Sequence, residues 1–146
     1  MKRAYLLAAF LALIGGPGSS ASAEGLDVVT ATGSHHYDVE IANDDKSRER
    51  GLMLRDKMAP DHGMLFEFPS RTPVTFWMKD TLLSLDMAFI DIDVTVRRVV
   101  EGARPMSETL IPSGEPVTGV LELNAGQAAA IHLKPGDKVK FPFFLQ

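Results

Sequence analysis

The residue types best suited to chemistry gather around the single tryptophan and at two later acids: Trp77, Lys79, Asp80, Thr81, Asp86 and Glu122. A lysine beside an acid, with a second acid across a sheet, can anchor a polar ligand or exchange protons. The flat face of a tryptophan can stack on a sugar ring while charged groups fix its hydroxyls. We therefore expect these residues to bind a small polar ligand or a sugar, with Trp77 stacking and the charged side chains anchoring.

Two other interpretations of the same residues stay open. Asp86 or Glu122 could serve as acid or base in a hydrolase of envelope polymers that uses a carboxylate pair. The polar group could instead be structural, because Asp and Thr readily hydrogen-bond the backbone where a strand ends. The chain would then be a structural protein that binds a partner. We expect a binding or accessory module rather than an enzyme, and no catalytic residue is assigned.

The sequence predicts neither a metal site nor a cofactor. His35 and His36 are adjacent in a strand pattern, so their side chains point to opposite faces and do not readily chelate one ion. The six methionines after residue 23 could hold Cu(I) with a histidine, but most lie in apolar runs, where methionine fills core space. The lack of cysteine excludes thiolate ligands, thiol nucleophiles and disulfides.

Residues 1–23 are expected to be a signal peptide. Lys2 and Arg3 precede an apolar run over residues 4–14, and Ala21-Ser22-Ala23 offers a cleavage pattern of small residues. The apolar run is shorter than the roughly 20 residues of a membrane-spanning helix. We therefore expect residues 24–146 to form one domain, periplasmic or secreted, with no integral membrane anchor after cleavage.

The net charge of the chain limits the classes of partner that it can bind. Of 15 basic residues, two lie in residues 1–23, which leaves 13 against 19 acidic residues and a net charge of −6 for the remainder. Binding to nucleic acid or to anionic membranes needs a positive field, so neither is expected. The sequence does not identify a protein partner.

Short strands are expected to position the polar group. Alternating and β-branched runs predict strands over residues 26–32, 35–42, 64–68, 74–78, 85–92, 94–101, 117–123 and 138–145. Short helices are expected over residues 46–53 and 127–132, the second capped by Asn124. Residues 102–116 read as a long irregular loop and a candidate lid. This pattern predicts an all-β, single-domain, jelly-roll-like sandwich or closed barrel with one or two short helices.

Several motifs occur in an order that resembles a known family. They are Arg50-Gly51-Leu52-Met53, Gly63-Met64-Leu65-Phe66, Phe76-Trp77-Met78-Lys79-Asp80-Thr81, Leu85-Asp86-Met87-Ala88-Phe89-Ile90-Asp91, Val120-Leu121-Glu122-Leu123-Asn124-Ala125-Gly126 and Leu133-Lys134-Pro135-Gly136-Asp137. Together they resemble the DUF192 family, a bacterial and archaeal domain of unknown function, from about Val28 onward. The resemblance implies an all-β, jelly-roll-like fold and no assigned reaction.

The chain departs from the family pattern at a few positions. Asp80 stands where the family usually has asparagine, so an acid replaces a neutral amide. Met106 and Ser113 fall in a loop where many members carry cysteines. Asp93-Val94 stands in place of the usual Asp-Gly turn, so the glycine that a tight turn favours is absent there.

Overall fold

The computed structural model describes residues 22–145, so the expected signal peptide lies almost wholly outside the described residues. The strands are β1 (Glu24–Thr30), β2 (Gly33–Ala42), β3 (His62–Thr72), β4 (Thr75–Phe76), β5 (Leu85–Ile90), β6 (Val96–Ala103), β7 (Ile111–Pro112), β8 (Val117–Asn124) and β9 (Lys138–Lys140). The helices are α1 (Asp45–Arg50), α2 (Gln127–Ala130) and the 3-10 helix η1 (Pro142–Leu145). The predicted all-β class with two short α-helices is confirmed. Between residues 22 and 145, these helices fall well short of the length that crossing a membrane would require.

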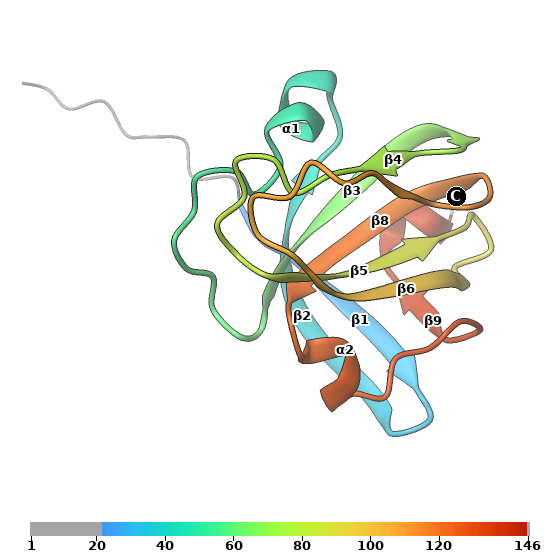
Figure 1. The fold of residues 1–146 in the computed structure, drawn as a ribbon. Coiled ribbons are helices and arrows are strands. Elements are labelled where there is room, and N and C mark those ends of the chain that lie inside the picture. The colour runs from blue at the N-terminus through green and yellow to red at the C-terminus, as the bar shows by residue number, and fades with distance from the viewer. Residues whose placement is uncertain (1–21, 146) are drawn as a thin grey trace, which may run out of the picture.

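Seven strands form one curled sheet in the order β6-β5-β8-β3-β2-β1-β9, and β4 pairs with β7 in a small second sheet. The large sheet curls into a half-barrel whose two edge strands approach each other at one end (Figure 1). There Thr95 and Lys138 form an antiparallel bridge, and the Val139 amide donates a 2.9 Å hydrogen bond to the Val94 carbonyl. Curling and this edge contact shorten the unpaired edges that an open sheet would leave.

Each face of the large sheet carries its own apolar cluster. Leu121 and Leu123 of β8 pack into the first cluster, whereas Val120 on the opposite face packs into the second. The central strands β5 and β8 are consequently buried along nearly their whole length. Burial on both faces explains why these strands lack the strict alternation of apolar and polar residues that a half-exposed strand shows.

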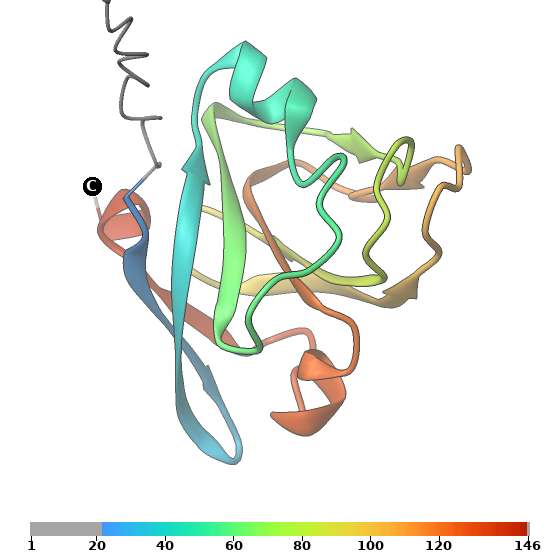
Figure 2. The ribbon, with the colours of Figure 1, turned by 90° about the vertical axis from the view of Figure 1, so that its left-hand side faces the viewer.

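The two α-helices lie at opposite ends of the curled sheet (Figures 1 and 2). Helix α1 begins after Asp44, whose side chain forms a capping box with Ser47, and ends at Gly51, which has φ 47°. That left-handed glycine stops the helix earlier than the expected residue 53.

The prediction that Asn124 caps α2 is wrong, because the capping position is Gly126 with φ 94°. Asn124 is still part of β8, and its Nδ2 donates to the carbonyls of Met58 and Ala59 at 3.0 and 3.1 Å. The side chain therefore holds the segment before β3 against the end of β8.

The last predicted strand is also shorter than expected. It ends at Lys140, and Pro142 opens η1, since proline has no amide to continue a strand ladder. Within the expected irregular loop 102–116, Ile111 and Pro112 form β7 and pair with β4.

Candidate functional site

A cavity of about 800 Å³ opens on the second apolar cluster, between α1 with the segment after it, β4 and the turn at residues 77–81. It brings together five of the six residues predicted to form a site: Trp77, Lys79, Asp80, Thr81 and Glu122. Its volume lies within the range of roughly 300–1,000 Å³ that small-molecule sites occupy.

Glu122 lies where β8 passes the cavity. Its direct cross-strand neighbours are Met64 on β3 and Met87 on β5, both buried, so its carboxyl projects from an apolar sheet face. The residue is only 4% exposed, and burial raises its pKa to about 8. Desolvation disfavours the charged carboxylate, and no charge or hydrogen bond from residues 22–145 contributes to the shift. At neutral pH the side chain is therefore a protonated carboxylic acid that can both donate and accept a hydrogen bond.

Aromatic rings line much of the cavity. Phe66 and Phe76 pack edge to face with 5.0 Å between their centroids, and Phe68 and Trp77 line the same space. Trp77 is 44% exposed, which is high for the only tryptophan of a small protein and places it at the mouth. The Nζ of Lys79 lies 5.2 Å from the centroid of the Trp77 ring, in cation–π contact. An apolar ring with a positive charge beside it therefore borders the opening.

The turn at residues 78–81 is held by backbone bonds. The Thr81 hydroxyl donates to the Lys79 carbonyl at 3.1 Å, and the Thr81 amide donates to the Met78 carbonyl at 3.1 Å. Asp80 has φ 53°, a left-handed conformation that Asp and Asn adopt more readily than most residues. Thr81 thus shapes the turn, while Lys79 and Asp80 supply its charges.

Asp86 lies away from the cavity lining and serves the backbone. One carboxylate oxygen accepts from the Gly102 amide at 2.8 Å, and the other accepts from the amides of Gly126 and Ala128 at 2.9 Å each. The residue is 2% exposed. Asp86 therefore joins β6 to the start of α2, and of the two predicted carboxylates only Glu122 lines the cavity.

The 102–116 loop lies against the site turn without lining the cavity. The Met78 amide donates to the Ser107 carbonyl at 2.9 Å, and the Met106 amide donates to the Thr81 carbonyl at 3.0 Å. The loop therefore supports the turn through backbone hydrogen bonds. Among residues 22–145, much of the remaining cavity lining comes from residues 45–54.

Sequence reasoning missed the contribution of α1 and of the phenylalanines. Arg48 fixes α1 over β3, because its Nη1 donates to the Glu67 carbonyl at 2.8 Å and its guanidinium lies 5.6 Å from the Phe68 ring centroid. Gly51 then lets the chain pass close to Phe66, where an added Cβ would lie 3.2 Å from the ring. The only sequence signal was the alternation of Phe66 and Phe68, which indicates a shared face of one strand.

The chain is thus a small all-β protein with a curled sheet and a cavity that is lined in part by the short helix α1. Residues 28–141 match the model of the DUF192 family, which is described as an uncharacterized ACR. The chain belongs to this family, as its motifs predicted. No curated protein matches the chain.

Two solved structures are similar to this chain. One is described as a proposed transcription regulator from Sinorhizobium meliloti; it is 49% identical, with 84% of this chain and 97% of that chain covered and a TM-score of 0.81. The other is a protein of unknown function from Novosphingobium aromaticivorans; it is 34% identical, with 86% and 90% covered and a TM-score of 0.82. These likenesses extend over nearly the whole of both relatives, so the fold is shared throughout.

Proposed function

We propose that this protein is an exported binding module that holds a small organic ligand in the cavity between α1 and the 77–81 turn. The observation that carries the proposal is Glu122, a buried acid with a pKa raised to about 8 at a cavity of about 800 Å³. A buried polar group without a partner is costly, and a ligand that hydrogen-bonds it recovers that cost.

The chemistry of the lining indicates the kind of ligand. Phe66, Phe76 and Trp77 suit a flat ring, and the protonated acid of Glu122 suits a hydroxyl or carbonyl deep in the cavity. Lys79 and Asp80 at the mouth suit polar substituents that remain near water. A sugar or another polar ring compound combines these features, with its apolar face on Trp77 and a hydroxyl directed to Glu122.

The proposed location rests on the amino-terminal sequence. The basic pair, the apolar run and the Ala21-Ser22-Ala23 pattern predict export, so the ligand would be one present outside the cytoplasm. The chain has a formal net charge of −4, which does not favour binding to nucleic acid, although the Sinorhizobium relative is described as a proposed transcription regulator.

The test uses Trp77 as a built-in reporter. The dye anilinonaphthalene sulfonate, an apolar ring system with an anionic group, is titrated while energy transfer from Trp77 is recorded. Saturable binding that Lys79→Met weakens supports the pocket, and sugars that displace the dye then identify the ligand class. Dye binding that does not saturate, or whose affinity is unchanged in both Lys79→Met and Phe76→Ala, would count against a ligand site.

One observation favours a second candidate, a hydrolase. A carboxyl that is protonated at neutral pH is suited to general-acid catalysis, and Asp80 lines the same cavity as Glu122. Glu122→Gln separates the two functions because glutamine keeps hydrogen-bonding groups but cannot deliver a proton. If the parent protein turns over a substrate and Glu122→Gln binds it without turnover, the protein is an enzyme. If both proteins bind the ligand and neither turns it over, the protein is a binding module.

A further inference from the structure

A row of acids and histidines crosses β1, β2 and β3 on the same sheet face as the cavity but outside its lining. Asp27 on β1 pairs directly with His36 on β2, and Asp38 on β2 pairs directly with His62 on β3. Residues two apart on a strand share a face, so His36 and Asp38 project together. Asp61, immediately before β3, adds a third carboxylate.

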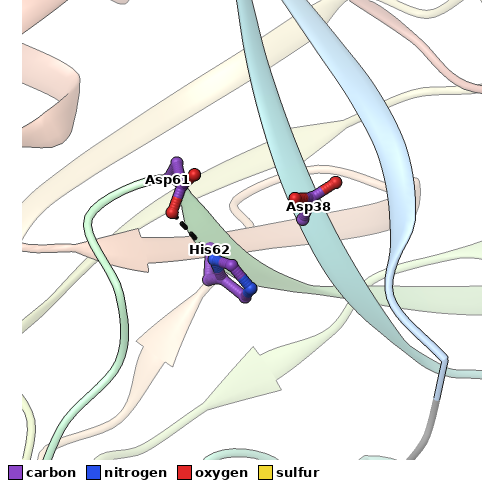
Figure 3. Close-up of side chains that lie close together, drawn as sticks. All are labelled: Asp38, Asp61 and His62. Carbon is purple, nitrogen blue, oxygen red and sulfur yellow. Dashed lines mark hydrogen bonds and ion pairs between the residues drawn. The ribbon is translucent and has the colours of Figure 1, made fainter.

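Three of these side chains converge closely (Figure 3). One ligand atom from each of Asp38, Asp61 and His62 lies within 4.8 Å of the other two. The Nδ1 of His62 lies 2.8 Å from a carboxylate oxygen of Asp61. All three side chains are at least partly exposed, so an ion from solvent can reach them.

His36 lies next to Asp38 on the same face of β2 and is held in place by Asp27. Its Nδ1 lies 2.8 Å from a carboxylate oxygen of Asp27, and its Nε2 lies 3.6 Å from a carboxylate oxygen of Asp38. The ring fits because residue 25 is glycine; a Cβ there would lie 2.7 Å from the imidazole Cε1. A ligating carboxylate is commonly oriented by such an outer partner, so His36 is suited to positioning Asp38.

We propose that Asp38, Asp61 and His62 bind a divalent transition-metal ion of the Zn²⁺ type, with His36 as a positioning residue. Zn²⁺ bonds imidazole nitrogen and carboxylate oxygen at about 2.0–2.2 Å, which places neighbouring ligand atoms about 3.3–3.5 Å apart in a tetrahedral site. The ligand atoms of the three side chains already lie within 4.8 Å of one another, and binding an ion would bring them to that spacing. Water would fill the fourth position, as at other Zn²⁺ sites with three protein ligands.

The local charge and donor types favour this ion over the alkaline earths. Imidazole nitrogen suits Zn²⁺, Cu²⁺ and Ni²⁺, whereas Ca²⁺ takes six to eight oxygen ligands that these three side chains do not supply. The nearby cation Arg55 forms a bidentate pair with Glu40, so that its charge is compensated beside the cluster. Adjacent His35 does not belong to the site, because its Nε2 is hydrogen-bonded to the Thr32 hydroxyl at 2.9 Å on the other sheet face.

The test is calorimetric titration of untagged protein with Zn²⁺, and visible absorption with Co²⁺ as a spectroscopic substitute. We expect one ion per chain, a loss of at least tenfold in Zn²⁺ affinity in His62→Ala and Asp38→Asn, and unchanged affinity in the matched control His35→Ala. Equal concentrations of Mg²⁺ or Ca²⁺ should not displace Zn²⁺. Gly25→Ala, which removes no ligand, should weaken binding severalfold and alter the Co²⁺ spectrum by displacing His36.

Two results would overturn the proposal. One is the absence of saturable Zn²⁺ binding, and the other is binding that His35→Ala weakens as much as His62→Ala does. Far-ultraviolet circular dichroism of each variant confirms that the fold persists. None of these residues lines the α1 cavity, so the outcome is independent of the proposed ligand.

Discussion

The backbone amide of Leu54 donates a 2.9 Å hydrogen bond to the carbonyl of Asp80, and both residues have left-handed backbones, with φ 61° and 53°. This bond joins the segment after α1 to the turn that carries Trp77 and Lys79, so the two sides of the cavity are tied together. Met106, whose amide bonds to the same turn, is left-handed as well. Such conformations cost about 1–3 kcal/mol each and gather at functional sites, which agrees with the proposal that the cavity binds a ligand.

The conformation of Asp80 makes a prediction about stability. Asp80→Asn should change the free energy of unfolding by less than about 0.5 kcal/mol, because asparagine tolerates the left-handed region. Asp80→Val should destabilise the protein by about 2 kcal/mol, since a β-branched residue is strained there. Urea unfolding followed by Trp77 emission measures both, and equal midpoints for the two variants would show that the turn does not impose this backbone.

Glu122 makes stability depend on pH. Below about pH 4.5 the carboxyl is protonated in both the folded and the unfolded chain, but between about 4.5 and 8 only the folded chain holds the proton. The contribution of Glu122 to the free energy of unfolding therefore falls by about 1.4 kcal/mol for each pH unit across that window, and the loss ends above it.

Glu122→Gln removes this titration and keeps the size of the side chain. As pH rises from 5 to 8, the parent protein should therefore lose stability that the variant keeps, so the free energy of unfolding of the variant should rise relative to that of the parent. Urea midpoints at several pH values give the slope. A difference that stays constant over this range would mean that the acid is already ionised in the folded protein.

Asp86 should behave as a structural residue. Its replacement by alanine leaves the amides of Gly102, Gly126 and Ala128 without their acceptor and should cost about 3 kcal/mol or more. Dye binding in the cavity should survive under conditions where the variant remains folded. If Asp86→Asn kept full stability but lost dye binding, Asp86 would belong to the ligand site after all.

The sequence predicted the elements better than the site. The alternating pattern predicted the β1–β2 hairpin, and the helix expected from residue 46 begins at Asp45, because these signals are local. The polar motif around the tryptophan correctly placed Trp77, Lys79 and Asp80 together, and all three line the cavity. Helix α1, however, meets this motif only through long-range packing, such as the Leu54–Asp80 bond, and a local pattern does not encode it.

The same limit explains the different outcomes for Asp86 and Glu122. Both are acids within apolar runs, and the sequence does not distinguish them. Asp86 turns toward three backbone amides, whereas Glu122 faces an apolar cluster at a cavity. The proximity of Asp38 and His62 was not predicted for a related reason, because these residues become neighbours only through the parallel pairing of β2 with β3.

The turn between β5 and β6 offers a further test. Val94 has φ 63°, a strained conformation for a β-branched residue, and it packs against the first apolar cluster, as does Val99 on β6. In Val94→Gly, relief of about 1–2 kcal/mol of strain should offset the lost packing, leaving a change within about 1 kcal/mol. In the matched control Val99→Gly, lost packing and the flexibility of glycine should cost roughly 2–3 kcal/mol. Similar costs for the two variants would contradict strain at Val94.

The most direct test of the ligand pocket is native mass spectrometry of the protein, isolated gently and without dialysis from cells that express it. The account predicts a population carrying an added small mass, lost in Trp77→Ala and kept in Ile92→Ala, which removes an exposed apolar side chain away from the cavity. A bare polypeptide mass throughout, or an added mass that Trp77→Ala leaves in place, would contradict it.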